Sequence, residues 1–144
     1  MRRVIKFIRA GRREQGLLLG AWSALVAIKL ALKILPFHVV YRLHQRWTCS
    51  PARRPAAGLA SPAEVVRATE RVSYYVPGGR NCLARALTGK LLLARRGHDA
   101  LLRLGAARMD DKIQAHAWLE YEGKILIGQE AAGQFTPFPP GRIQ

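Results

Sequence analysis

The feature that most constrains the fold is a helical pattern at residues 81–96 that is followed by a run of short apolar segments. Leucines recur along one face of this pattern, and Gly97 follows it as a natural helix stop. Three later segments are short and apolar enough to be strands: 99–108, 112–121 and 123–129. The Asp-Asp pair at 110–111 and the Glu-Gly pair at 122–123 are typical of turns between strands. The second half therefore predicts a helix followed by an antiparallel meander, in an α+β fold.

The N-terminal segment is basic at its start and then strongly apolar. No charged residue occurs from Leu17 to Ile28, but this run is shorter than the roughly 20 apolar residues that cross a bilayer. Pro36 ends or bends the helix that these residues predict, and a second basic helix is expected at 37–47. For this segment we expect, in order of preference, a buried helical hairpin, a membrane-surface helix or a signal anchor.

A proline-rich stretch at residues 48–62 separates the two halves and predicts a linker. Ser61, Pro62 and Glu64 then form a helix-start pattern, with a capping serine, a proline in the first turn and an acidic residue that completes a capping box. Three parts of one compact domain are expected: a basic apolar helical segment at 1–47, the linker at 48–62 and a core at 63–144.

The charge of the chain suggests an anionic partner. The formal net charge is +15, from 24 Lys and Arg against 9 Asp and Glu. Nucleic acid, a membrane surface or an acidic peptide would suit this excess, and so would a plain arginine-rich solvated surface. No zinc-finger spacing, glycine-rich phosphate loop or RNA-binding aromatic signature occurs, so we expect no nucleic-acid partner. The 2 cysteines are too few for a disulfide framework, which indicates a reducing, cytoplasmic location.

Cys82 follows Asn81 at the start of the predicted helix, in the stretch GGRNCLARAL. At that position the helix dipole and unpaired backbone N–H groups favour a thiolate. The same N–H groups, including that of Cys82 itself, could hold an oxyanion formed at a carbonyl substrate. The alternative is a small buried residue that happens to be a thiol. The choice between them depends on whether the fold supplies a base.

The chain has 4 histidines that could act as this base: His38, His44, His98 and His116. His38 and His44 lie on the basic N-terminal helices, where we expect solvated surface positions. His98 follows the helix stop and is expected in a loop. His116 interrupts a strand, next to small residues and on the same strand face as Trp118, which suggests a cleft. Cys82 with His116 is therefore the candidate catalytic pair, against a buried thiol and a strand histidine whose hydrogen bonds are satisfied.

The third catalytic group is the least defined by the sequence. Glu120 shares a strand face with His116, but four residues of strand separate them by about 13 Å, which is too far for a hydrogen bond. With a two-residue Glu-Gly turn, simple antiparallel register places Gln129 opposite His116 and turns Glu130 to the other face. A one-residue bulge would place Glu130 there instead. An amide or a carboxylate can fix the imidazole tautomer, so both residues stay open.

Three blocks of the sequence carry a family resemblance: NCLARALTGKLLLARRGHDALLRLGA, then AHAWLEYEGKILIG, and FTPF. Together they resemble the transglutaminase-like family of lasso-peptide maturation proteins, in its small split form that lacks a fused precursor-recognition domain. The resemblance covers about residues 80–138, and the N-terminal half fits it more loosely.

The resemblance implies a papain-like cysteine peptidase fold, in which a cysteine-bearing helix packs on a small antiparallel sheet. It implies Cys82 as nucleophile and His116 as general base, without cofactor or metal. Members often carry an aspartate soon after the histidine strand, where this chain has ILIGQEAAG. Glu130 is slightly preferred for the third role, because a carboxylate stabilises an imidazolium better than an amide does, with a bulge at the glycine of GQE turning it inward.

The function implied by the resemblance is removal of the leader from a lasso precursor peptide, before ring closure by an asparagine-synthetase-like cyclase. A separate leader-recognition protein is expected as a further partner. Two alternatives stay open: a catalytically silent scaffold that binds precursor and cyclase, and a protein in peripheral contact with a membrane through residues 15–35. Cys49 lies in the proline-rich linker, where we expect no base nearby, so its thiol should have no role.

Overall fold

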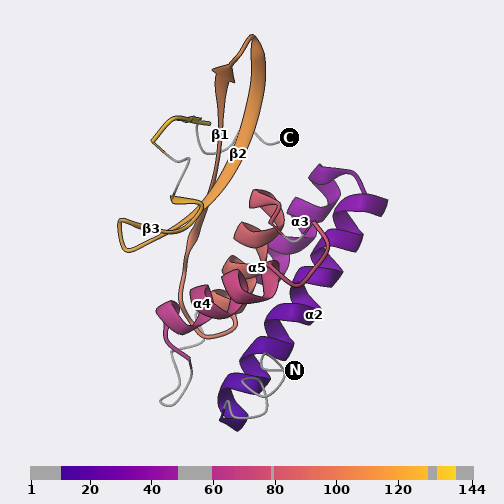
Figure 1. Cartoon of the computed structure of the whole chain (residues 1–144), viewed down its shortest axis with the longest axis vertical. Coiled ribbons are helices and arrows are strands. Elements are labelled where there is room, and N and C mark those ends of the chain that lie inside the picture. The colour runs from indigo at the N-terminus through magenta and orange to yellow at the C-terminus, as the bar shows by residue number, and fades with distance from the viewer. Residues whose placement is uncertain (1–10, 49–59, 79, 130–132, 139–144) are drawn as a thin grey trace.

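The computed structural model describes residues 11–48, 60–78, 80–129 and 133–138. Its elements follow one another in this order: α2 (Arg12–Ile34), α3 (Phe37–Thr48), α4 (Pro62–Ser73), α5 (Cys82–Ala94), β1 (Leu101–Met109), β2 (Lys112–Tyr121), β3 (Lys124–Ile127) and β4 (Thr136–Pro137). The helices form one body, and the sheet rises from it with the tip of the β1–β2 hairpin projecting farthest (Figure 1). The α+β fold expected from the sequence is confirmed.

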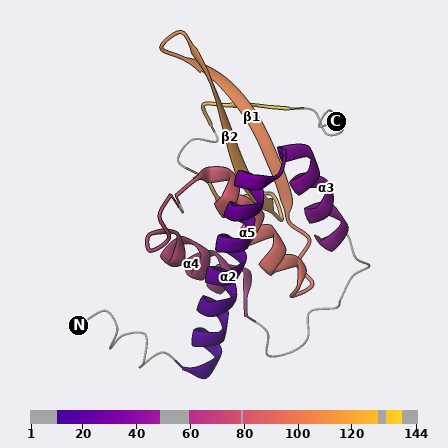
Figure 2. The same ribbon diagram turned by 90° about the vertical axis from the view of Figure 1, so that its right-hand side faces the viewer.

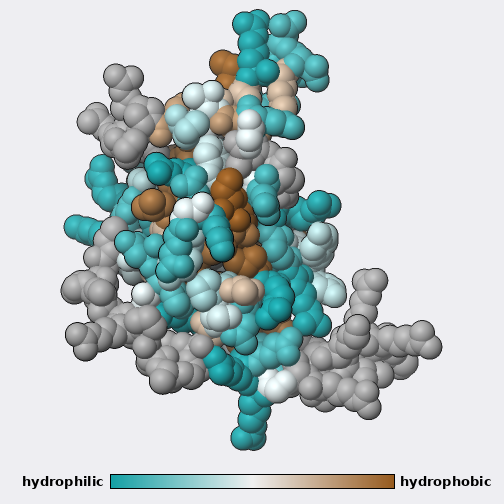
Figure 3. All heavy atoms as spheres, turned by 90° about the vertical axis from the view of Figure 1, so that its left-hand side faces the viewer, coloured by the Kyte–Doolittle hydropathy of each residue, from teal (hydrophilic) through white to brown (hydrophobic). Residues whose placement is uncertain are grey.

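Helix α2 packs against α4 and α5, and its inner face belongs to the main hydrophobic core. Leu17, Leu25 and Ile28 are buried there. Its outer face is apolar as well, with exposed Leu19 and Trp22, and in Figure 2 this helix lies in front of the others. By length and composition α2 is able to cross a membrane, and 33% of its most apolar window is buried inside the protein. The opposite side of the molecule shows a hydrophobic patch within a mostly hydrophilic surface (Figure 3).

Helix α3 begins directly after Pro36, as the sequence predicts, but one of its histidines is not where the sequence placed it. His44 is buried rather than solvated, and its Nε2 lies 2.8 Å from the carbonyl oxygen of Leu87 on α5. Val40 is buried on the same helix. The amphipathic α3 turns this face onto α5, so tertiary packing overrides the basic character of the surrounding sequence.

Helix α4 starts as its sequence predicts. The Ser61 side chain accepts a hydrogen bond from the Glu64 N–H, and the Glu64 carboxylate accepts one from the Ser61 N–H. These bonds complete the capping box, with Pro62 in the first turn. Thr48 ends α3 and Pro62 begins α4, so both ends of the expected linker are helical. Residues 49–59 lie outside the described part of the chain.

The sheet has the order β3-β2-β1-β4, and its strand pairs are antiparallel. Both predicted turns are present. Asp110 and Asp111 have φ values of 46° and 60°, and Glu122 and Gly123 have values of 49° and 75°. Two successive left-handed residues give the turn a twist that matches the flanking strands. The meander expected after the helix is thereby confirmed.

Helix α5 lies between the other helices and the sheet, and it is buried along most of its length. It ends before Gly97, whose φ of 80° is the left-handed conformation of a helix stop. The helix approaches the sheet most closely at Gly89, where an added Cβ would lie 2.5 Å from Cδ1 of Ile127. Arg85, also buried, forms an ion pair with Glu70 of α4. The sequence assigned one apolar face to this helix, and packing on both sides buries nearly all of it.

Candidate active site

Cys82 is the first residue of α5 and is partly buried, with a free thiol. Asn81 is the residue that caps this helix. Its side-chain oxygen accepts hydrogen bonds from the N–H groups of Leu83 and Ala84, at 3.0 and 3.2 Å. The Arg85 N–H donates to the Asn81 carbonyl. Asn81 therefore occupies most of the amides that the sequence offered as oxyanion donors.

The backbone N–H of Cys82 remains available. It has no hydrogen-bond partner among the described residues, which lack Gly79. An amide on the nucleophile itself is well placed for the oxygen of a carbonyl under attack, because that oxygen develops next to the new bond. The helix start thus offers one thiol and one amide donor, with Asn81 holding the turn that presents them.

His116 lies on β2 and contacts two aromatic rings. Its ring stacks against Phe135, with centroids 5.0 Å apart and planes 29° apart, and against Trp118, with centroids 6.3 Å apart and planes 21° apart. Opposite His116 on β1 is Gly105, where an added Cβ would lie 2.9 Å from the Trp118 ring. The absence of a side chain at position 105 therefore makes room for the aromatic ring beside His116.

The pairing of β2 with β3 contains a one-residue irregularity. Glu120 pairs with Ile125, but Leu119 pairs with Ile127, so Leu126 is the extra residue. The sequence placed a bulge at the glycine of GQE, and the structure places it two residues earlier. Pairing ends at Ile127, and the next residue, Gly128, turns the chain with φ 85°.

The His116 ring is hydrogen bonded to this turn. Its Nε2 lies 3.2 Å from the carbonyl oxygen of Gly128. Of the two side chains proposed for the third role, Gln129 is exposed, and Glu130 lies outside the described residues. Apart from the glycine itself, nothing in the sequence indicates a main-chain acceptor, and apart from the FTPF block nothing indicates Phe135.

Glu120 has other partners than His116, as its distance along the strand predicts. Its carboxylate accepts hydrogen bonds from Trp118 Nε1 at 2.8 Å and from Arg103 Nε at 3.2 Å. The Trp118 hydrogen bond and, to a lesser degree, the Arg103 guanidinium lower the pKa of Glu120. This carboxylate fixes the indole that stacks on His116 and does not reach the imidazole.

Cys82 and His116 lie toward the same end of the contact between α5 and the sheet. α5 crosses the sheet at Gly89, next to Leu119 of β2. Cys82 precedes Gly89 by about 10 Å of helix, and His116 precedes Leu119 by about 10 Å of strand. In both ribbon views α5 starts at its end nearer the tip of the β1–β2 hairpin, and β2 runs away from that tip (Figures 1 and 2). From the crossing point, helix and strand therefore run in a common direction. Side chains alternate along a strand, so Leu119 faces α5, whereas His116 leaves the other face of β2, together with Trp118 and Glu120.

No hydrogen bond joins the thiol of Cys82 to the ring of His116, both of which belong to the described part of the chain. The structure thus supplies a thiol at a helix start and a held imidazole on the adjacent sheet. A thiol and an imidazole are the two groups that acyl transfer through a cysteine requires.

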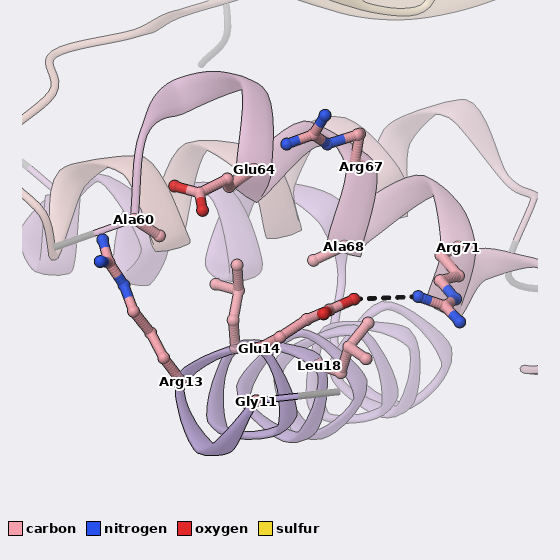
Figure 4. A pocket seen from close by; sticks show the side chains of 10 residues that line it. Gly11, Arg13, Glu14, Leu18, Ala60, Glu64, Arg67, Ala68 and Arg71 are labelled. Carbon is pink, nitrogen blue, oxygen red and sulfur yellow. Dashed lines mark hydrogen bonds and ion pairs between the residues drawn. The ribbon is translucent and has the colours of Figure 1, made fainter. Parts of the chain in front are cut away.

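Two cavities elsewhere in the described structure contain neither residue. One, of about 470 Å³, lies between α2 and α4, and the ion pair of Glu14 with Arg71 crosses it (Figure 4). The other, of about 410 Å³, lies between α2, α3 and α5 and is lined mainly by apolar side chains. Within the described residues no group of three or more His, Cys, Asp or Glu could hold a metal ion. Both cavities lie between neighbouring helices, and neither is lined by Cys82 or His116.

The sequence matches the family described as the transglutaminase-like superfamily over residues 22–139. The chain belongs to this superfamily. The matched range begins within α2 and extends beyond β4, so it includes Cys82 and His116. No curated protein and no solved structure matches the sequence significantly. The transglutaminase-like superfamily includes cysteine peptidases, which agrees with thiol chemistry at this site.

Proposed function

We propose that this transglutaminase-like chain is a cysteine endopeptidase that removes the leader from a ribosomally made lasso precursor peptide. The observation that carries the proposal is the start of α5, where an Asn81 cap presents the Cys82 thiol, together with the hydrogen-bonded imidazole of His116 on β2 of the sheet that packs on this helix. Superfamily membership supports peptidase chemistry, and the three sequence blocks support the lasso precursor as substrate. Ring closure would follow on an asparagine-synthetase-like cyclase.

The chemistry needs only this chain, the peptide and water. His116 takes the thiol proton, and Sγ of Cys82 attacks the scissile carbonyl carbon, while the Cys82 N–H stabilises the oxyanion. Collapse of this intermediate breaks the C–N bond, and His116 gives its proton to the departing amine of the core peptide. Water then hydrolyses the leader thioester and regenerates the thiol. The released amine is the group that a macrolactam requires.

The decisive experiment is cleavage of a lasso precursor by single-residue variants, followed by mass spectrometry. Cys82→Ala and His116→Ala should each abolish cleavage while the circular dichroism spectrum stays native. Cys49→Ala is the matched thiol control and should cleave at the wild-type rate. Retained cleavage by either site variant would remove the peptidase assignment.

The same variants distinguish a peptidase from a catalytically silent scaffold. A chain that acts only by holding precursor and cyclase together would still support lasso formation as Cys82→Ala. A peptidase variant would instead accumulate full-length precursor. The resemblance to the small split form of the lasso maturation proteins also predicts that cleavage rises when a separate leader-binding protein is supplied. Efficient, leader-specific cleavage by the isolated chain would contradict this part of the proposal.

The outer face of α2 favours a second role, contact with an anionic membrane surface. Leu19, Trp22, Leu30 and Ile34 are exposed on this face at helical spacing. Within α2 and α3 the cations are Arg12, Arg13, Lys29, Lys33, Arg42 and Arg46, against the single acid Glu14. An apolar helix face with Trp and flanking cations suits the boundary of an anionic bilayer.

Sedimentation with lipid vesicles tests this role. The wild type should sediment with vesicles that contain anionic lipid and stay in solution with neutral vesicles. The double variant Trp22→Glu/Leu30→Glu should lose this binding, and Tyr74→Glu, at an exposed position directly after α4, serves as control. If the wild type stays in solution with both vesicles, the role is wrong. If the double variant weakens only the interaction with the leader-binding protein, the face serves a protein partner.

A further inference from the structure

The hydrogen bond between His116 and Gly128 determines which ring nitrogen carries the proton. A backbone carbonyl oxygen only accepts hydrogen bonds, so Nε2, which lies 3.2 Å from it, must be the donor. In the neutral ring the other nitrogen, Nδ1, is then unprotonated. A general base needs such a free nitrogen, and a triad normally obtains it through a carboxylate or an amide on a third residue.

The backbone conformation at Gly128 and the space around it favour this contact. Gly128 is buried and has φ 85°, which disfavours side chains. A Cβ at this position would lie 2.9 Å from the Ala117 carbonyl oxygen, 3.0 Å from the Trp118 Cβ and 3.2 Å from the His116 Nε2. The extra residue at Leu126 changes the register just before this turn. Glycine therefore allows the main chain to come close enough to reach the imidazole.

The plane of the ring is held by different groups. Phe135 and Trp118 both stack on His116, and the Trp118 indole is itself tied to Glu120 by a 2.8 Å hydrogen bond. Stacking restricts the tilt of the ring but does not choose between its two tautomers. Among the described residues, the ring has one hydrogen-bond partner, the Gly128 carbonyl.

We infer that Gly128 is the positioning residue of this site, and that its main-chain carbonyl takes the place of the third catalytic side chain. The carbonyl keeps the proton on Nε2, so that Nδ1 accepts the thiol proton of Cys82. When the ring becomes an imidazolium, the same carbonyl stays bonded to Nε2–H. The catalytic part of this inference rests on the proposed peptidase function, whereas the tautomer does not.

Nitrogen NMR of the imidazole tests the tautomer without any substrate. The His116 ring signals are assigned by their loss in His116→Gln, at a pH where the ring is neutral. The wild type should show the Nε2–H form. A ring protonated on Nδ1 would overturn the inference.

A backbone ester tests the carbonyl without adding a side chain. Incorporation of the α-hydroxy acid analogue of glutamine at position 129 turns the Gly128 carbonyl into an ester carbonyl, which is a weaker acceptor. We expect kcat to fall by about tenfold or more, with KM changed little, because substrate binding does not use this atom. The Nε2–H signal should also weaken. An ester chain with wild-type kcat and tautomer would contradict the inference.

Glycine substitutions give a simpler comparison. Gly128→Ala should lower kcat at least as much as the ester, because the added Cβ pushes against His116. Gly123→Ala is the matched control, since Gly123 also has a positive φ, of 75°, but no atom lies within 4 Å of its Cβ position. Equal losses of kcat in both variants would attribute the effect to backbone strain and overturn the inference.

Glu130→Gln is the competing test, because a carboxylate at position 130 is the alternative third group. Its loss of kcat should be smaller than that of the ester, and a larger loss would overturn the inference.

The proposed function and the positioning by Gly128 can fail separately. A wild type with the Nε2–H tautomer that cleaves no precursor would remove the proposed function and leave the positioning by Gly128. A wild type that cleaves the precursor but carries the proton of the His116 ring on Nδ1 would remove the positioning by Gly128 and leave the proposed function.

Discussion

At the scale of single residues, His44 links the packing of the helices to pH. Burial lowers the pKa of His44 from its ordinary 6.5, and the nearby charge of Lys90 adds to this, whereas the hydrogen bond to the Leu87 carbonyl acts in the opposite direction. The folded state therefore resists protonation more than the unfolded chain does. The stability contributed by neutral His44 is present above a pH of about 6.5 and is lost as the pH falls.

We expect His44→Gln to reduce the pH dependence of folding. Glutamine keeps a donor for the Leu87 carbonyl but cannot titrate, so the free energy of unfolding should fall less between neutral and mildly acidic pH than in the wild type. Urea unfolding at several pH values measures this difference. His38→Gln, an exposed position on the same helix, should keep the wild-type dependence. Parallel curves for wild type and His44→Gln would contradict the prediction.

The sequence singles out candidate side chains for the site but not their surroundings. Cys82 and His116 could be selected from the sequence because thiol and imidazole are rare and because each falls next to a clear structural signal. The Gly128 contact could not be predicted, since every residue carries a carbonyl and only the fold brings this one to the ring. His44 was misplaced for a related reason: its burial depends on α5, which lies far away in the sequence.

At the scale of elements, the contact between α5 and the sheet depends on a glycine. Gly89 lies against Ile127 and Leu119, which are both fully buried. Gly89→Val should lower the free energy of unfolding by about 1–3 kcal/mol, because the added carbons have no space. Thermal unfolding measures this loss.

Gly20→Ala on α2 is the matched control for this substitution. No atom lies within 4 Å of its Cβ position, so alanine should stabilise the chain by about 1 kcal/mol through helix propensity alone. A Gly89→Val chain as stable as the wild type would mean that helix and sheet are not packed this closely.

Local signals explain why the element boundaries were predicted well. The capping box at Ser61, the stop at Gly97 and the two turns of the meander each depend on a few neighbouring residues. The position of the bulge was predicted wrongly, because Leu126 becomes the extra residue through pairing of the whole β2–β3 hairpin. Similarly, periodicity gave α5 one apolar face, whereas two layers of packing bury it on both sides.

At the scale of the whole molecule, α2 belongs to the same hydrophobic core as the helix of Cys82. Leu25 is fully buried in this core, whereas Leu30 on the outer face of α2 is 53% exposed. Leu25→Ala should therefore cost about 2–5 kcal/mol of unfolding free energy, and Leu30→Ala less than about 0.5 kcal/mol. Denaturant unfolding of the two variants measures the difference. Equal effects would mean that α2 does not hold the core together.

The local order of the sheet has a consequence for folding kinetics. β1, β2 and β3 are neighbours both in the chain and in the sheet, and two-residue turns join them. Such hairpins close short loops and form in about 1–10 μs, far faster than pairings between distant segments. His116 and Gly128 lie within one of these hairpins. The imidazole and its carbonyl acceptor can therefore meet early in folding, before the sheet docks on α5.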